Sequence, residues 1–161
     1  MIAKYLKIFN IFLILIFTYN CGFKPVLVGS DYNFSILVDK SSGNDQVNYK
    51  IKEKLKVVDG RNRTFKVIIN TEETIKTISK DLKGDPTIYE IEINLDYKLT
   101  ENNKVLIHKS STQSSTYNNI QDKFELSKSK EILRDNLIDN LVSDIINSAG
   151  NLIVNPMGND N

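Results

Sequence analysis

The feature that most constrains the fold is residues 88–99, where apolar and polar side chains alternate from Tyr89 onward. One face would carry Tyr89, Ile91, Ile93, Leu95, Tyr97 and Leu99, and the other Glu90, Glu92, Asn94, Asp96 and Lys98. A period of two residues predicts a β-strand. The chain must therefore supply an apolar layer for one face of its sheet and leave the other face in water.

The residues before this strand predict an antiparallel partner. Residues 64–79 begin with alternating Phe65, Val67 and Ile69 and then become more polar, so we expect this strand to bulge or bend. Residues 83–86 contain glycine, aspartate and proline, a composition typical of a turn.

A return strand is predicted after a hairpin tip at residues 101–103. Val105 and Ile107 begin it, but residues 109–116 are rich in serine and threonine and contain no apolar side chain. This half of the sheet is either an exposed hydrophilic edge or a surface that another protein covers, because an uncovered edge invites pairing with other chains.

Two amphipathic helices are predicted on either side of the meander. In residues 45–58 the apolar side chains Val47, Ile51, Leu55 and Val58 recur at helical spacing. We expect Asp59 and Gly60 to end this helix.

The second helix is expected to begin at Asn118 or Asn119, with Asp122 in its first turn, and to end at Gly150. Its apolar stripe would comprise Phe124, Leu133, Leu137, Ile138, Leu141, Val142, Ile145 and Ile146.

A short alternating segment at residues 34–38 adds a first strand, so the order is strand, helix, three strands, helix. Two amphipathic helices can both cover the apolar face of one sheet. The sequence therefore predicts an α+β fold, a two-layer sandwich in which a four-stranded, mostly antiparallel sheet carries two helices on one face. This domain would span residues 34–153, followed by a disordered tail at residues 154–161.

The N-terminus is typical of an export signal. Lys4 and Lys7 precede an apolar run that is too short to span a bilayer, and residues 1–20 are predicted as a signal peptide. The run leads to Cys21, the chain's single cysteine, which is a free thiol, an intermolecular bridge or a modified residue. Its position favours acylation as the mature N-terminus of a lipoprotein, with residues 21–33 as a lipidated tether. The alternative is an uncleaved anchor in the inner membrane.

Charge and motifs argue against several functions. Without residues 1–20 the chain keeps 19 basic and 20 acidic side chains, so no basic excess indicates nucleic acid. His108 is the sole histidine, the adjacent Glu72 and Glu73 are expected to be surface acids, and no His/Cys set or glycine-rich phosphate loop is present. We therefore expect no enzyme activity, no metal and no cofactor.

The chain resembles the LptE family of lipopolysaccharide-assembly lipoproteins. The resemblance rests on Cys21-Gly22-Phe23, on the alternating strand from Tyr89 to Leu99 with its return strand, and on Ser115-Thr116-Tyr117-Asn118 before the helix. It covers roughly Cys21 to Leu152. It implies an outer-membrane lipoprotein, anchored by its lipid on the periplasmic side, that sits as a plug inside the β-barrel protein LptD. It also implies assistance in barrel assembly, insertion of lipopolysaccharide into the outer leaflet and contact with lipopolysaccharide itself.

The predicted topology suggests where an anionic lipid would bind. Lys80, Lys83 and Lys123 would meet at one end of the sheet, where ammonium groups can pair with phosphates. They would otherwise be ordinary solvated lysines. Lys98, Lys104 and Lys109 are a second candidate set near the opposite end. The alternative function is a periplasmic ligand-binding or transporter-accessory lipoprotein, which would have a closed apolar pocket.

Overall fold

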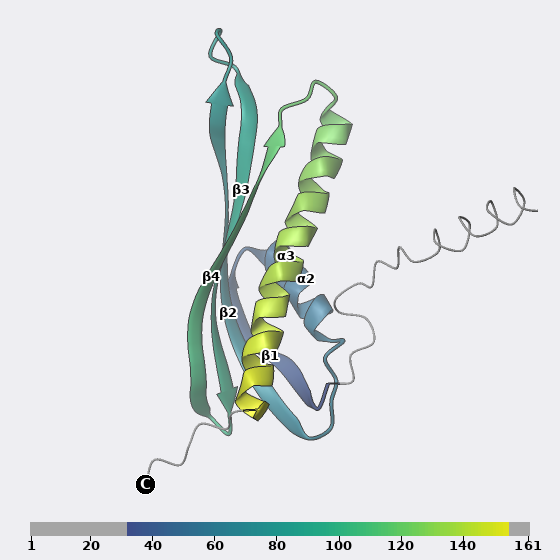
Figure 1. The fold of residues 1–161 in the computed structure, drawn as a ribbon, viewed down its shortest axis with the longest axis vertical. Helices are drawn as coiled ribbons and strands as arrows, with labels where there is room; N and C mark the ends of the chain where they lie inside the picture. Colours follow the sequence, from purple (N-terminus) through teal and green to yellow (C-terminus); the bar gives the residue numbers. More distant parts are fainter. Residues whose placement is uncertain (1–31, 155–161) are drawn as a thin grey trace, which may run out of the picture. The chain divides into compact units, whose positions relative to one another are not determined.

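The sheet is built around β3 (Pro86–Glu101), the strand with the alternating sequence. A computed structural model describes residues 32–154, and the predicted signal, Cys21, most of the tether and residues 155–161 lie outside them. β3 pairs antiparallel with β2 (Arg63–Lys80) and β4 (Lys104–Asn118), while β1 (Phe34–Gly43) pairs parallel with β2 (Figure 1). The order β1-β2-β3-β4 makes β1 and β4 the two edges.

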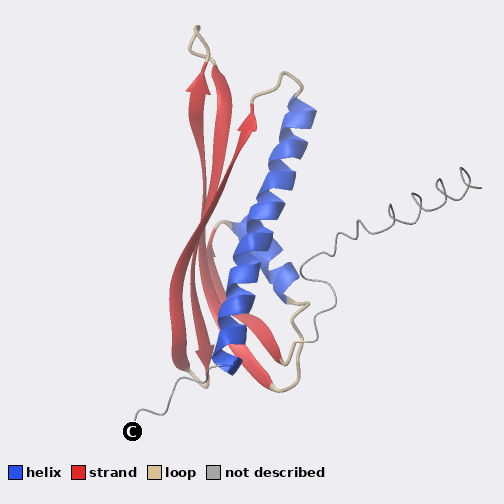
Figure 2. Ribbon diagram, viewed as in Figure 1, coloured by secondary structure: helices blue, strands red, loops and turns tan. Residues whose placement is uncertain are grey.

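Two helices form the second layer. α2 (Asp45–Leu55) packs on β1 and β2, and α3 (Lys123–Val154) packs on β3 and β4 (Figure 2). Ion pairs from Lys50 to Asp135 and from Lys54 to Asp139 join the helices at 2.7 and 2.6 Å. The predicted two-layer α+β sandwich with a mostly antiparallel sheet is confirmed. Within residues 32–154 no helix has both the length and the apolar composition needed to cross a membrane.

The core lies between the sheet and the helices. Ile91, Ile93, Leu95, Tyr97 and Leu99 are at most 1% exposed, whereas Tyr89 is only half-buried. They meet Phe65, Val67 and Ile69 of β2, Val47, Ile51 and Leu55 of α2, and Ile138, Leu141, Val142 and Ile145 of α3, all at most 1% exposed. The second face of β3 stays polar and partly exposed, so the predicted division into a packed and a wet face is confirmed.

β1 and α2 meet at a close backbone approach. Gly43 has φ 91°, and a Cβ built there would lie 1.8 Å from the carbonyl oxygen of Thr71. Asn44 donates its backbone N–H to the same carbonyl at 3.0 Å, and its side chain caps α2 by accepting from Val47 N at 3.0 Å. β1 therefore continues to Gly43, beyond the predicted end at residue 38.

α2 ends earlier than predicted. The sequence placed its end at residue 58, but the helix stops at Leu55. Val58 donates its N–H to the Leu55 carbonyl at 3.0 Å and is 3% exposed, so it joins the core from the turn that follows the helix.

The ends of α3 correct three predictions. Asp122 is the cap, since its Oδ1 accepts from Phe124 N and Glu125 N at 2.9 and 3.2 Å, whereas Asn119 Nδ2 donates to the Pro86 carbonyl. Phe124 is 73% exposed and lies outside the apolar stripe.

The helix also continues through Gly150 to Val154, so residue 154 belongs to it and not to a tail. Leu152 is 7% exposed, and Arg63 Nη1 donates to its carbonyl at 3.1 Å. These contacts offset the roughly 1 kcal/mol that a glycine costs inside a helix.

A buried ion pair joins α3 to β2. Arg134 donates from Nε and Nη2 to the two carboxylate oxygens of Glu73 at 2.7 and 2.6 Å, and the two side chains are only 10% and 7% exposed. The hydrogen bonds that Arg134 donates to Glu73 raise the pKa of Arg134. The expectation that Glu73 is a surface acid is wrong, because α3 covers it.

The Arg134–Glu73 pair leads to a test of stability. Arg134→Ala leaves a buried carboxylate unpaired and is expected to lower the free energy of unfolding by about 3–5 kcal/mol. Glu73→Leu combined with Arg134→Met should restore most of this loss. Urea denaturation followed by circular dichroism measures both. Lys76→Ala, which breaks the exposed pair with Glu92, is the control and should cost less than about 1 kcal/mol. An equal effect of Arg134→Ala and Lys76→Ala would contradict the prediction.

Gly43 leads to a second test, with Gly84 as its matched control. Both have positive φ, 91° and 89°, but a Cβ on Gly84 meets nothing within 4 Å. Gly84→Ala should therefore cost only the backbone strain, about 1–2 kcal/mol. In Gly43→Ala the added methyl group would also push β2 away from the β1–α2 junction. The midpoint of thermal unfolding should therefore fall clearly further for Gly43→Ala than for Gly84→Ala. Similar drops for the two variants would refute the close approach.

Candidate functional site

The open face of the sheet is a surface of small polar side chains. From Ser110 to Asn118, β4 carries no charged residue, and Ser110, Thr112, Ser114 and Thr116 are exposed. Thr112 Oγ1 donates to Asn94 Oδ1 at 2.6 Å, and Ser110 Oγ donates to Asp96 Oδ2 at 3.2 Å. Hydroxyl groups of β4 thus pair across the strands with carboxylate and amide groups of β3. This surface can form hydrogen bonds at many points but has little apolar area to bury.

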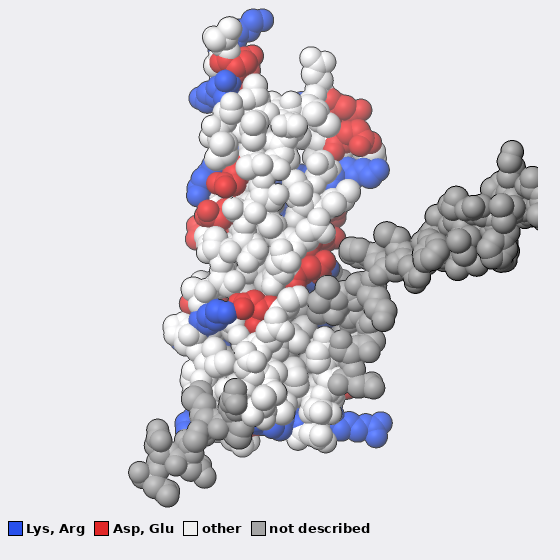
Figure 3. All heavy atoms as spheres, viewed as in Figure 1, with Lys and Arg blue, Asp and Glu red and all other residues white. Residues whose placement is uncertain are grey.

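Most side chains over β4 and α3 on the face seen in Figure 3 are uncharged, although charged side chains cross its lower middle. Five exposed or half-exposed residues of α3 contribute amide and hydroxyl groups at helical spacing: Asn136, Asn140, Ser143, Asn147 and Asn151. Charged side chains, both basic and acidic, border this area on both sides. Amide and hydroxyl groups of α3 therefore accompany the hydroxyl groups of the edge strand β4.

His108 lies on the open face in a cross-strand pair. Its Nε2 is 3.1 Å from both carboxylate oxygens of Asp96, and both side chains are exposed. Ser110 donates to the same carboxylate instead of to His108, so the three residues do not form a nucleophile–base–acid relay. In residues 32–154 no three His, Cys, Asp or Glu side chains gather into a possible metal site.

The three lysines proposed to contact an anionic lipid lie at one end of the domain. Lys80 is the last residue of β2, Lys83 lies in the β2–β3 turn, and Lys123 is the first residue of α3 (Figure 1). All three are exposed. Asn119 links the two segments, donating from its backbone to the Thr87 carbonyl at 2.8 Å and from Nδ2 to the Pro86 carbonyl at 2.7 Å. We call this region, residues 80–86 and 119–124, the turn end.

The turn end also carries exposed apolar side chains that sequence reasoning missed. Leu82 is fully exposed, Phe124 is 73% exposed and Ile120 is 40% exposed. The sequence contains a signal for Leu82, because an apolar residue between Asp81 and Lys83 in a predicted turn cannot reach a core. For Phe124 no such signal exists, since its spacing fits the helix stripe.

The second lysine set does not form one cluster. Lys98 alternates with buried Tyr97 and lies on the open face, Lys104 lies at the β3–β4 tip, and Lys109 lies on the helix side of β4. Lys109 Nζ is 2.6 Å from Asp144 Oδ1 of α3, and this hydrogen bond raises the pKa of Lys109. Lys109 therefore ties α3 to the sheet.

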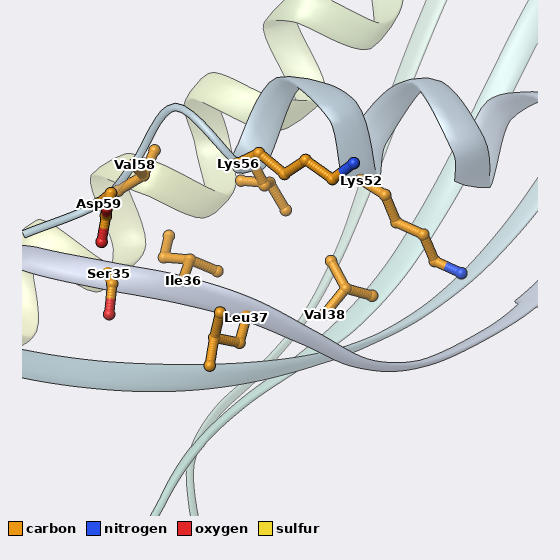
Figure 4. A pocket seen from close by; sticks show the side chains of 9 residues that line it. Ser35, Ile36, Leu37, Val38, Lys52, Lys56, Val58 and Asp59 are labelled. Carbon is orange, nitrogen blue, oxygen red and sulfur yellow. The ribbon is translucent and has the colours of Figure 1, made fainter.

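The structure contains a groove along the edge strand β1 (Figure 4). It holds about 560 Å³ between β1, the C-terminal half of α2 and the turn at Val58 and Asp59. Lys52 of α2 and Lys56, the residue after the helix, extend beside it. The apolar residues Ile36, Leu55 and Val58 that line it are only 3%, 1% and 3% exposed, whereas Leu37 is 56% exposed. The groove is open to solvent and is not a closed apolar pocket.

Comparison with known proteins shows the fold. No family model and no curated protein matches this chain. The crystal structure of rare lipoprotein B from Shewanella oneidensis has a TM-score of 0.57 at 16% identity, covering 77% of this chain and 100% of that one. An uncharacterized lipoprotein B from Nitrosomonas europaea has a TM-score of 0.56 at 12% identity, covering 83% and 93%. A putative lipoprotein from Caulobacter crescentus has a TM-score of 0.54 at 10% identity, covering 78% and 93%. This chain therefore has a fold found in bacterial lipoproteins.

Proposed function

We propose that this protein is a lipid-anchored lipoprotein of the bacterial outer membrane that acts in lipopolysaccharide assembly. Like the LptE family that it resembles, it would lie inside the β-barrel protein LptD as a plug and help that barrel to assemble. Together the two proteins would insert lipopolysaccharide into the outer leaflet. The observation that carries the proposal is the one-sided sheet, packed under helices on one face and lined with hydroxyl, amide and carboxylate groups on the other.

The chemistry of the open face supports a partner whose contact surface is polar and hydrated. A barrel that encloses water has a polar inner wall. Against such a wall, Ser110, Thr112 and Ser114 offer donors and acceptors without the cost of burying an unpaired charge. Because residues 110–118 of β4 carry no charge, they do not repel a partner surface of either positive or negative charge. A plug needs many such contacts spread over a large area.

The lipid anchor is the second part of the proposal. Cys21, acylated after cleavage of residues 1–20, would hold the domain at the membrane through several acyl chains. A single chain binds a bilayer only marginally, whereas two or more anchor stably. The fold shared with three bacterial lipoproteins supports this part, because all three carry that description.

The turn end is the proposed contact for lipopolysaccharide. Lys80, Lys83 and Lys123 project from two connected segments at one end of the domain, and lipid A carries phosphates with which their ammonium groups can pair. The alternative function, a periplasmic ligand-binding lipoprotein, has less support. The groove beside β1 is open to solvent, whereas a ligand-binding lipoprotein of this kind was expected to have a closed apolar pocket.

Site-specific cross-linking tests the plug proposal. A photoreactive p-benzoylphenylalanine in place of Ser114, on the open face, is expected to cross-link to a large β-barrel protein in intact cells. The same group in place of Tyr49, 64% exposed on α2, is the matched control and should give much less product. Mass spectrometry identifies the partner. Equal cross-linking at both positions, or none at Ser114, would count against a barrel wall over the open face.

Mass spectrometry of the purified full chain tests the anchor. We expect a mature N-terminus at Cys21 with a mass increase of several acyl groups, and Cys21→Ser should abolish this increase and leave the signal uncleaved. Membrane fractionation of both forms provides the second readout. A native chain that begins at Met1 with an unmodified thiol would remove the outer-membrane part of the proposal.

A further inference from the structure

We propose that the edge strand β4 pairs antiparallel with β4 of a second copy of this chain, about a two-fold axis at Gln113. The inference goes beyond the proposed function, because it concerns the edge of the sheet and a partner identical to the chain itself. The backbone of the edge, the order of its side chains and the flank of α3 each contribute one step.

The edge of β4 is long and lacks the features that usually protect a sheet edge. From Ile107 to Asn118 its pairing with β3 is unbroken, and residues 110–118 contain no charge and no proline. In the described part of the chain, no segment other than β3 bonds to the backbone of residues 110–118. The opposite edge, β1, is partly covered, since Gly60 donates its backbone N–H to the Phe34 carbonyl at 2.9 Å. An uncovered, uncharged edge of this kind is a template for another strand.

One backbone hydrogen bond shows which groups of β4 point outward. Asn119 donates its N–H to the carbonyl of Thr87, the residue opposite it, at 2.8 Å. In an antiparallel pair, hydrogen-bonded and non-hydrogen-bonded residues alternate, so Gln113 also bonds to β3 and the even-numbered residues point away from it. The outward N–H and C=O groups therefore belong to Ser110, Thr112, Ser114 and Thr116. Donors and acceptors that recur at every second residue are complementary to an extended polypeptide strand.

The order of side chains on β4 suits a second copy of the same strand. Residues 110–116 read Ser-Ser-Thr-Gln-Ser-Ser-Thr, which is nearly symmetric about Gln113. Antiparallel pairing about this residue puts each hydroxyl residue opposite another one: Thr112 opposite Ser114, Ser111 opposite Ser115 and Ser110 opposite Thr116. Cross-strand pairs of threonine and serine stabilise a sheet. Each contact would be made twice, as a two-fold axis requires.

Charge does not oppose this register. Beyond the hydroxyl residues, Lys109 would lie opposite Tyr117 of the second copy, and His108 opposite Asn118. No pair of like charges therefore faces across the axis. About eight backbone hydrogen bonds would form between residues 110–116 of the two copies.

The flank of α3 beside this edge is also nearly free of charge. Asp144 marks the flank, because its Oδ1 is 2.6 Å from Lys109 Nζ of β4. Residues spaced three or four apart share its side of the helix: Ser129, Leu133, Asn136, Asn140, Asp144, Asn147 and Asn151. Asp144 is the one charged member, and Lys109 neutralises it. Two such flanks can face each other without repulsion.

The position of α3 leaves room for a second copy. The helix reaches β2 through the pair of Arg134 with Glu73 and β4 through the pair of Asp144 with Lys109, so it lies over β3. Adjacent strands are about 4.8 Å apart, which would put the axes of the two α3 helices about 14 Å from each other. A helix with its side chains is about 10–12 Å across. The two helices would therefore stand side by side without overlap.

A single cysteine tests the axis directly. At a non-hydrogen-bonded pair the two Cα atoms are about 4.5 Å apart, a distance that a disulfide can bridge. Full-length Gln113→Cys is therefore expected to form a disulfide-linked dimer under mild oxidation, seen on a non-reducing gel. Ser111→Cys, on the same face and equally half-buried, is the matched control, because its two copies would lie about 14 Å apart. It should give no more dimer than the wild-type chain, which carries only Cys21.

Mixed chains test the register. Ser111→Cys and Ser115→Cys chains, mixed before oxidation, should cross-link to each other, and peptide mapping by mass spectrometry identifies the linked thiols. Equal linkage through Ser111→Cys and Gln113→Cys would overturn the register. Absence of linkage through Gln113→Cys would overturn the proposed pairing.

Charge substitutions on the open face provide a second readout. Thr112→Lys together with Ser114→Lys places lysine opposite lysine at both pairs and should weaken dimerisation at least about tenfold. Thr112→Lys together with Ser114→Asp changes the same positions but opposes unlike charges, so it should dimerise as well as wild type. Sedimentation of the full-length chains in detergent measures both, and circular dichroism checks that they are folded. Equal dimerisation of the two variants, or a wild-type chain that stays monomeric, would overturn the inference.

This inference and the plug proposal can fail separately. A barrel cross-link from Ser114, with a purified chain that is monomeric at every concentration, would overturn the pairing of β4 and leave the plug intact. A dimer linked through Gln113→Cys without any barrel cross-link would do the opposite.

Discussion

The structure depends on the two-residue period of β3. Five of its side chains are at most 1% exposed and point under the helices, and each neighbour between them points to the open face. Because the period is two, a shift of one residue against β2 or β4 would place all five in water and bury Glu92, Asn94 and Asp96 instead. The register is therefore strongly determined, and both the covering layer and the hydroxyl-rich face follow from it.

Local patterns predicted the elements whose structure is decided by near neighbours. β3 and its burial, the stripe of α2 and the hairpin tip were all predicted from a few adjacent residues. At that tip Asn102 and Asn103 have φ values of 49° and 65°, which asparagine tolerates better than most residues. The bulges in β2 after Thr77 also lie in the polar half where a bend was expected. The turn-end lysines lie at one end because the meander topology alone brings them there.

Contacts between distant residues decided the features that the sequence did not predict. Gly150 normally favours a helix end, but Leu152 packs into the core and Arg63 binds its carbonyl, so α3 continues. Asn119 was expected to cap a helix, but its amide is used by Pro86. Glu73 was expected to be a surface acid and Lys109 a candidate for lipid contact, but α3 places Arg134 and Asp144 against them. None of these partners lies near in sequence.

The parallel pairing of β1 with β2 has a consequence for how the chain is made. A parallel strand cannot be joined to its neighbour by a tight hairpin, and here α2 lies in the connection. During synthesis from the N-terminus, Phe34, Ile36 and the apolar stripe of α2 emerge before the strand that will cover them. The nascent chain thus exposes its first core residues until residues 63–80 have left the ribosome, which makes this segment a natural client for chaperones that bind extended apolar peptides.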